Sequence, residues 1–162
     1  MTTQTISLGL WFNRQAEETV QLYTSIFLDT RTDGMLRASV DTPGAKTGET
    51  LLVDFTLAGR KSHALNGGAH DRFNDAMSLV VTCQDHAEVD RLWDALLADG
   101  GTPVQCGWLK DKFGISWQIV PEVLPKMINE KDREKSKRVM EAMMQMVRLD
   151  IDALQQAYHQ SA

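Results

Sequence analysis

Residues 6–27 read ISLGLWFNRQAEETVQLYTSIF, and they decide the fold of the first half of the chain. Residues 6–12 place apolar side chains at alternate positions, which is the two-residue period of a β-strand. From Ala16 onward the apolar residues recur every three or four positions, which predicts an amphipathic helix ending near Phe27. Asn13 is the expected N-cap of this helix. The stretch therefore predicts a strand followed by a helix.

Residues 77–96, MSLVVTCQDHAEVDRLWDAL, repeat this pattern. A strand at Met77–Cys83 is followed by Asp85 and Glu88, whose spacing is that of a capping box at a helix start. The buried stripes of the two predicted helices correspond at a constant offset of 73: Ala16, Thr19, Val20 and Tyr23 match Val89, Leu92, Trp93 and Leu96. An internal repeat of this kind predicts two like modules and an α+β fold.

Each predicted helix is followed by strands in antiparallel order. In the first half these are a short strand around Met35–Val40 and a hairpin of residues 51–57 and 61–66 that turns at Ala58-Gly59-Arg60. In the second half they are residues 102–105, 106–110 and 115–120, with a turn at residues 111–114. We therefore expect two βαβββ modules, residues 1–68 and 69–121.

Residues 122–162 form a predicted helical tail within one compact domain. Pro125 can begin a helical turn, and a helix beyond Asp132 carries an apolar stripe of Val139, Met140, Met143, Met144 and Val147. Asp152 with Gln155 resembles the capping box of a short terminal helix. Packing in the core or at a dimer interface is the favoured role of the methionines, since thioethers fill irregular gaps.

Composition excludes several classes of function. The chain has 162 residues, a formal net charge of −5 and a pI near 5.3, which argue against a phosphate-backbone footprint and so against nucleic acid. Cys83 and Cys106 are too few for a disulfide framework and too far apart for a zinc site. No signal-like segment or long apolar run is present, so we expect a cytoplasmic protein without a membrane partner.

Several blocks of the sequence resemble PhnB-like proteins of the vicinal oxygen chelate superfamily, the glyoxalase, bleomycin resistance and dioxygenase group. They are Leu10-Trp11-Phe12-Asn13, Ala64-Leu65-Asn66-Gly67-Gly68, Val89-Asp90-Arg91-Leu92-Trp93 and, most specifically, residues 105–121, QCGWLKDKFGISWQIVP. The resemblance implies two βαβββ modules with curved mixed sheets around a concave cavity, often completed by dimerisation. It therefore predicts a homodimer.

The resemblance also carries the label demethylubiquinone methyltransferase-like. A methyltransferase using S-adenosylmethionine usually has a glycine-rich turn between a parallel strand and a helix. Gly67-Gly68 follows an expected antiparallel hairpin and leads into a polar loop, so it does not match. The sequence gives methyl transfer no support.

In the superfamily, His and Glu side chains from the first and last strands of the modules hold a divalent metal on the concave face. In this chain the first strand has no histidine, Gln118 stands where a ligating glutamate is expected, and the fourth strand offers an amide at or near Asn66. Ser78, Val80 and Thr82 occupy the fifth strand. Amides and apolar groups bind transition metals poorly, so we expect no metal and no cofactor.

His63 leaves an alternative open. Alternation places it on the face opposite Asn66, and the sequence identifies no partner for it, so a structural role is slightly favoured over a functional one. An atypical metal site of His63 with Asp54 would instead indicate a metal-dependent isomerase or dioxygenase.

The favoured reading is a small-molecule binding or sequestering protein that works without a metal. Amides and indole rings suit a neutral or aromatic ligand, because the amides fix its orientation and the rings supply apolar area. The expected ligand-binding residues are Trp11, Asn66, Cys106, Trp108 and Gln118, with Cys106 and Trp108 on one strand face. No catalytic residue is identified.

Overall fold

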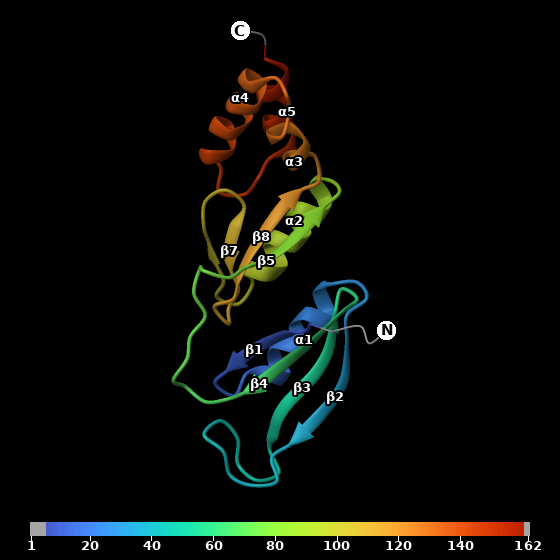
Figure 1. Cartoon of the computed structure of the whole chain (residues 1–162), viewed down its shortest axis with the longest axis vertical. Coiled ribbons are helices and arrows are strands. Elements are labelled where there is room, and N and C mark those ends of the chain that lie inside the picture. The colour runs from blue at the N-terminus through green and yellow to red at the C-terminus, as the bar shows by residue number, and fades with distance from the viewer. Residues whose placement is uncertain (1–5, 161–162) are drawn as a thin grey trace. The chain divides into compact units, whose positions relative to one another are not determined.

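The computed structural model describes residues 6–160, and the chain divides between Arg72 and Phe73 into two compact units (Figure 1). The first unit contains β1 (Leu8–Phe12), α1 (Ala16–Ile26), β2 (Arg31–Arg37), β3 (Thr50–Leu57) and β4 (Arg60–Asn66). The strands form one sheet in the order β1-β4-β3-β2, in which β1 runs parallel to β4 and the other pairs are antiparallel. Helix α1 packs on one face of this sheet, against β3 and β4.

The second unit repeats this topology. It contains β5 (Leu79–Cys83), α2 (His86–Leu97), β6 (Thr102–Pro103), β7 (Trp108–Lys110) and β8 (Ser116–Pro121). The sheet order is β5-β8-β7-β6, again with one parallel pair, β5 with β8. The α+β class with two βαβββ modules is therefore confirmed, and every residue of the two predicted helix stripes is buried.

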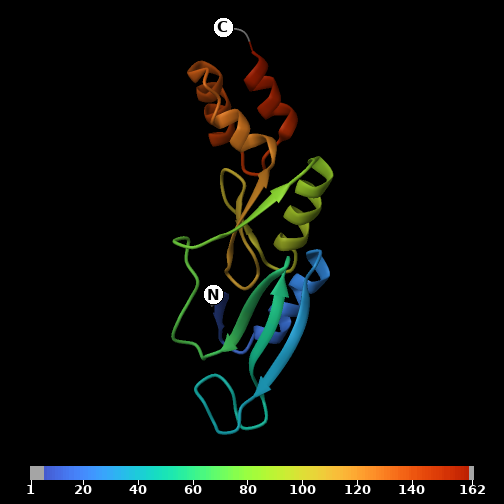
Figure 2. The ribbon, with the colours of Figure 1, turned by 45° about the vertical axis from the view of Figure 1, so that its right-hand side comes forward.

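Three helices follow β8, as predicted for the tail. They are α3 (Val123–Ile128), α4 (Arg133–Met144) and α5 (Ile151–His159), and they pack together (Figure 2). Their own small core consists of Leu124, Val139, Leu149 and Leu154, and Met143 packs against it. The predicted methionine stripe is only partly buried, because Met140 and Met144 are 42% and 58% exposed. Val147 lies beyond the end of α4 and is also exposed.

The helix starts agree only in part with the sequence. Asp85 caps α2 as predicted, since its side chain accepts from the backbone N–H of Glu88 at 2.9 Å. Helix α1 begins after Gln15 rather than at Asn13, and Gln15 makes no side-chain cap. Helix α5 is capped by Asp150 rather than Asp152. The expected caps at Asn13 and Asp152 are therefore wrong.

The strands around Cys106 also differ from the prediction. Cys106 and Gly107 have left-handed backbones, with φ of 60° and 81°, so neither belongs to a strand. Their N–H groups donate to the carbonyls of Met146 and Val147, both at 2.8 Å. A side chain at Gly107 would lie 2.8 Å from Leu149, so this turn requires glycine. As a result β6 and β7 are short, and Cys106 does not share a strand face with Trp108.

Strand β2 begins at Arg31, four positions before the predicted Met35. Its pairing with β3 is irregular at two places, which weakens the alternation on which the prediction relied. None of the described helices is long and apolar enough to cross a membrane.

Candidate functional site

Each sheet has one face under its helix and an opposite face, which we call the open face. In β4, Ser62, Ala64 and Asn66 are buried on the helix side, whereas His63 and Leu65 alternate onto the open face. In β8, Trp117 and Ile119 are buried in the same way, whereas Gln118 and Val120 lie on the open face. The open faces thus present His63 in the first unit and Gln118 in the second.

His63 belongs to a short hydrogen-bonded chain on the first open face. Its Nδ1 lies 2.5 Å from Asp54 Oδ1, and its Nε2 lies 3.0 Å from Ser7 Oγ. A carboxylate only accepts, so Nδ1 carries the hydrogen, and Nε2 of the neutral ring accepts from the Ser7 hydroxyl. The sequence put Asp54 beside His63 only as an atypical metal site, and it missed Ser7. Asp54 lies opposite His63 only because of the β3–β4 register.

Gln118 occupies the equivalent position in the second unit. It lies opposite Val80 of β5, as His63 lies opposite Gly9 of β1. Its Nε2 donates to Ser78 Oγ at 2.8 Å, and Ser78 precedes Val80 by two residues as Ser7 precedes Gly9. The repeat therefore places a serine beside the central polar residue of each open face.

The neighbour across the antiparallel pair differs between the units. His63 lies opposite Asp54, whereas Gln118 lies opposite Trp108 of β7. Residues directly opposite one another in a sheet share a face, so Trp108 also lies on the open face, where it is half-buried. The first site is thus polar and the second combines an amide with an indole ring.

Each open face has a second polar group, at the strand position two residues before His63 or Gln118. In the first unit Asp33 accepts from Thr56 Oγ1 at 2.6 Å and from Lys61 Nζ at 2.9 Å. These bonds, that from Thr56 first and that from Lys61 next, hold the pKa of Asp33 below its usual value. The first open face therefore carries a lysine, Lys61, that is already paired with a carboxylate.

In the second unit Asp75 lies 3.1 Å from Lys110 Nζ and accepts from Ser116 Oγ at 2.9 Å. The hydrogen bond from Lys110, and then that from Ser116, lower the pKa of Asp75. Lys110 lies opposite Ser116 in the register, as Lys61 lies opposite Thr56 in the first unit.

Asn66 is not on an open face. Its side chain is buried, its Oδ1 accepts from the N–H of Ala16 at 3.0 Å, and its Nδ2 donates to the carbonyl of Thr50 at 2.9 Å. The amide thus links the start of α1 to the start of β3. Asn66 thus makes structural hydrogen bonds, and the residue of the first unit that occupies the position of Gln118 is His63.

The other two predicted ligand-binding residues, Trp11 and Cys106, lie in different units. Trp11 lies on the first open face, where its Nε1 donates to the carbonyl of Gly68 at 3.0 Å and its ring lies over Gly67. His70 packs edge-on against it, with ring centroids 4.8 Å apart. Cys106 is half-buried in the turn before β7. The other thiol, Cys83, is fully buried, and burial raises its pKa to about 12, so it is not a nucleophile.

The donors on the open faces do not fit a transition-metal site. Such an ion needs several imidazole or carboxylate groups that converge on it. The first face offers His63 and Asp54, which bind each other, and Asp33, which is held by Lys61. The central residue of the second face is the amide of Gln118.

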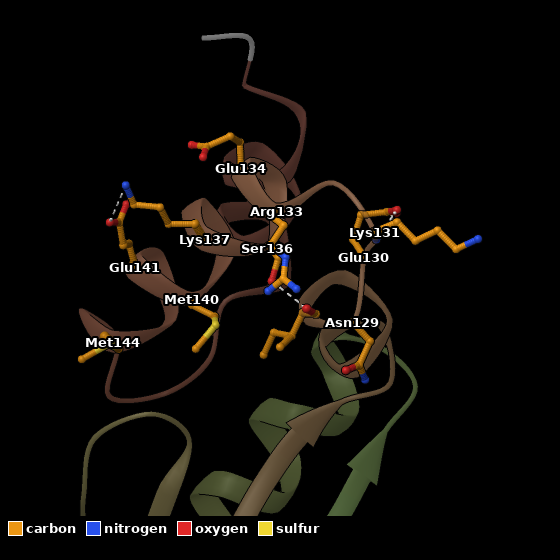
Figure 3. A pocket seen from close by; sticks show the side chains of 11 residues that line it. Asn129, Glu130, Lys131, Arg133, Glu134, Ser136, Lys137, Met140, Glu141 and Met144 are labelled. Carbon is orange, nitrogen blue, oxygen red and sulfur yellow. Dashed lines mark hydrogen bonds and ion pairs between the residues drawn. The ribbon is translucent and has the colours of Figure 1, made fainter.

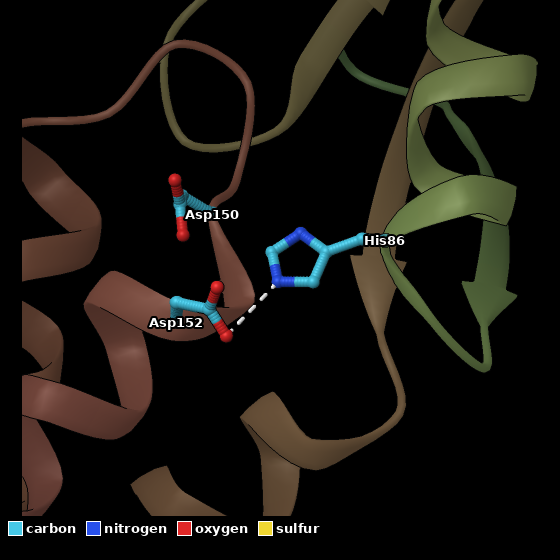
Figure 4. A group of neighbouring side chains, drawn as sticks. All are labelled: His86, Asp150 and Asp152. Carbon is cyan, nitrogen blue, oxygen red and sulfur yellow. Dashed lines mark ion pairs between the residues drawn. The ribbon is translucent and has the colours of Figure 1, made fainter.

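Among residues 6–160, one group of three candidate ligating side chains has atoms within 4.8 Å of one another, and it lies elsewhere (Figure 4). His86 starts α2, and its Nε2 lies 3.3 Å from Asp152 Oδ1 near the start of α5. Asp150 is occupied as the cap of α5. The N-termini of both helices carry a partial positive charge that disfavours a cation, so we interpret the group as a polar contact between α2 and α5.

A groove of ≈ 890 Å³ lies on the tail (Figure 3). Met140 and Met144 project into it from α4, and its remaining lining includes exposed side chains of both charges, such as Lys137 and Glu141. Polar groups that fix a ligand are usually few and convergent. The groove is therefore a less specific candidate than the open faces.

Two βαβββ units of this topology define a protein of the vicinal oxygen chelate superfamily. A family model described as 3-demethylubiquinone-9 3-methyltransferase matches residues 4–120, and the chain belongs to this PhnB-like family. No curated protein matches the chain. The match ends before α3, so the helical tail lies outside the family model.

Solved structures agree with this assignment. The PhnB protein of Bacillus cereus, provisionally named a 3-demethylubiquinone-9 3-methyltransferase, is 32% identical, covers 73% of this chain and 99% of its own, and has a TM-score of 0.65. A Pseudomonas aeruginosa protein is 20% identical, with coverage of 74% and 98% and a TM-score of 0.61. The fosfomycin resistance protein FosX of Listeria monocytogenes is 13% identical, with coverage of 78% and 98% and a TM-score of 0.52. The last two show the fold alone.

Proposed function

We propose that this protein binds a small organic molecule on the open faces of its sheets and does so without a divalent metal. The observation that carries the proposal is the pair of equivalent positions held by His63 and Gln118, each bonded to a serine at the start of its unit. Polar groups held at fixed positions beside apolar surface are what orients a small ligand.

The second open face supports a neutral, partly aromatic ligand. Gln118 supplies a donor and an acceptor, and Trp108 beside it supplies a broad apolar surface. Val80 is 59% exposed on the same face, which adds apolar area. Lys110 is paired with Asp75, so the face has little net charge to attract an ion.

The metal-free part of the proposal rests on donor chemistry. The residues that the family resemblance aligns with metal ligands include no convergent set of imidazoles and carboxylates, and amide oxygens alone bind such ions weakly. A metal-dependent isomerase or dioxygenase is the second candidate. The observation that favours it is the His63–Asp54 pair, an imidazole and a carboxylate on one open face.

Methyl transfer is not part of the proposal, although the family model and the Bacillus cereus protein carry that name. Gly67 and Gly68 follow β4, and Gly67 is required because the ring of Trp11 lies where a side chain would be. These glycines therefore serve local packing and do not form the phosphate-type turn of a nucleotide-like cofactor site.

We also propose a cytoplasmic homodimer, as the superfamily resemblance implies. Met140, Met144 and Val147 remain exposed on the tail, and Met35 and Leu36 are each 54% exposed on the edge strand β2. Exposed apolar residues of this kind favour an interface. Sedimentation should give twice the mass of the 18.2 kDa chain at micromolar concentration, and a single 18.2 kDa species would contradict the dimer.

A thermal-shift screen of small neutral and aromatic compounds in the presence of EDTA tests the function. Hits are then titrated by calorimetry into the wild type and variants. Gln118→Ala should weaken binding about 2- to 10-fold through a lost hydrogen bond, and Trp108→Ala about 10-fold or more through lost apolar contact. Gln155→Ala, on the exposed side of α5, is the matched control. Equal binding by all three variants would overturn the site.

A further inference from the structure

We propose that Ser7, His63 and Asp54 form a nucleophilic centre that accepts an acyl group from a small activated ester. The inference rests on the proposed function, because the acyl donor is a small molecule bound on the first open face. It goes beyond that function in assigning a reaction to the face.

The geometry is that of a serine activated by a histidine and a carboxylate. Ser7 Oγ lies 3.0 Å from His63 Nε2, which is within reach for proton transfer, and Asp54 Oδ1 lies 2.5 Å from Nδ1. Asp54 thereby fixes the tautomer in which Nε2 is the free base. The three side chains come from two neighbouring strands and the residue before β1, so the sheet itself sets their spacing.

The second unit shows that the serine contact alone is architectural. Ser78 receives a hydrogen bond from the amide Nε2 of Gln118, which cannot take a proton from it. The residue opposite Gln118 is Trp108, so no carboxylate stands at the position of Asp54. The first unit thus has a base and an orienting carboxylate exactly where its repeat has an amide and an indole ring.

A small ester can reach the first site. His63 and Asp54 are 44% and 48% exposed, and Ser7 is exposed. Gly9 lies directly opposite His63, and no atom lies within 4 Å of the position that a side chain there would occupy. This leaves open space above β1 beside both reacting groups.

The step balances within the site. Ser7 Oγ attacks the carbonyl carbon of the ester while its proton passes to His63 Nε2. The bond between the carbonyl carbon and the leaving oxygen breaks, and the leaving alcohol takes that proton. Ser7 is then esterified and His63 is neutral again, while Asp54 remains a carboxylate throughout. Water attacks the acyl-serine with His63 as base, which releases the carboxylic acid and restores Ser7.

The experiment uses p-nitrophenyl acetate and the full chain, with acetylation located by peptide mass spectrometry and its rate followed by release of p-nitrophenolate. We expect acetyl on Ser7 in the wild type. His63→Gln reproduces the Gln–Ser pair of the second unit and should slow acetylation of Ser7 about 100-fold. Ser25→Ala, at an exposed position of α1, should leave it unchanged, and Ser78 itself should stay unmodified. Asp54→Asn should also slow the reaction, and it decides the matter if His63→Gln fails to fold.

Acetyl found only on lysines or Cys106, or on Ser7 at the same rate in His63→Gln and Asp54→Asn, would overturn the proposal. The result is separable from the proposed function. If a screened compound binds in a way that depends on Gln118 and Trp108 but Ser7 is not acetylated, this inference alone is wrong. If Ser7 is acetylated but no compound binds in that way, the proposed site on the second open face is wrong.

Discussion

The two units of this protein share one topology but stabilise the start of their helices in different ways. Helix α2 is capped locally by Asp85, which is the residue just before the helix. Helix α1 is capped from a distance of fifty positions in the chain, by Asn66 at the end of β4. The supported N–H belongs to the first residue of α1 and to the third residue of α2, so the acceptor at a helix start can come from a neighbouring or from a distant residue.

The hairpin turns of the two units also differ in what stabilises them. The first unit turns through Ala58 and Gly59, both with positive φ, which suits a two-residue loop. The second unit turns at Asp111, a buried carboxylate that accepts from the N–H groups of Phe113 and Ile115 and from Nε1 of Trp117. One turn is a property of its backbone, whereas the other depends on a single side chain.

Replacing that side chain should give the largest effect. Asp111→Ala removes three hydrogen bonds, two of them to buried donors, and should lower the free energy of unfolding by about 3–4 kcal/mol. Asp111→Asn, which keeps the size, should cost less because one oxygen can still accept. Urea denaturation followed by circular dichroism measures both. Equal stability of the Ala variant and the wild type would show that the turn does not depend on Asp111.

Removing the remote cap should come next. Asn66→Ala leaves the N–H of Ala16 and the carbonyl of Thr50 without their partner in a buried setting, at a cost of about 2–3 kcal/mol. Asn74, which makes one exposed local bond to Ala76, is the matched control and should cost about 0.5 kcal/mol or less as Asn74→Ala. The same denaturation experiment compares the two variants. Similar losses of unfolding free energy would contradict the capping role of Asn66.

The local cap should matter less. Asp85→Ala exposes the N–H of Glu88 to water rather than burying it unpaired, so we expect a loss of about 1 kcal/mol. Hydrogen exchange of the first turn of α2 should rise while that of α1 stays unchanged. A loss as large as that of Asn66→Ala would mean that local and remote caps are equivalent.

The smallest effect concerns pH. Bonds from Lys110 and Ser116 lower the pKa of Asp75 in the folded state, so the stabilisation is present above the ordinary carboxyl pKa and disappears as the pH falls through the folded value. Asp75→Asn should therefore lower the melting temperature slightly at pH 7, and the difference should begin to shrink near pH 4 and vanish only once the pH is below the lowered pKa of Asp75. Melting curves across pH 2.5–7 for both proteins are the test. A difference that persists unchanged at the acid end would contradict the linkage.

Local patterns in the sequence predicted the repeat, both helices, the hairpins and the cap at Asp85, because each depends on residues close together in the chain. Side-chain roles set by register were missed. Nothing near Asn66 indicates that it reaches Ala16, and nothing near His63 indicates that it contacts Ser7. The left-handed turn at Cys106 was also missed, since pairing with the distant residues Met146 and Val147 supports it.

The family resemblance pointed to two amides, Gln118 and Asn66, and the structure has Gln118 on the open face and Asn66 on the helix side. A one-residue difference along a strand moves a side chain to the other face, and that is the separation between the open-face positions and Asn66. Only the observed registers, Gly9 opposite His63 and Val80 opposite Gln118, make the equivalence clear.

The central claim is that the open faces work without a divalent metal, and the metal content of the protein purified without chelator tests it most directly. We predict far less than one equivalent of Mn²⁺, Fe²⁺, Ni²⁺ or Zn²⁺ per chain, and a melting temperature that these ions leave unchanged. Stoichiometric metal that EDTA removes and that is absent from His63→Ala would contradict the claim and establish the metal-dependent alternative.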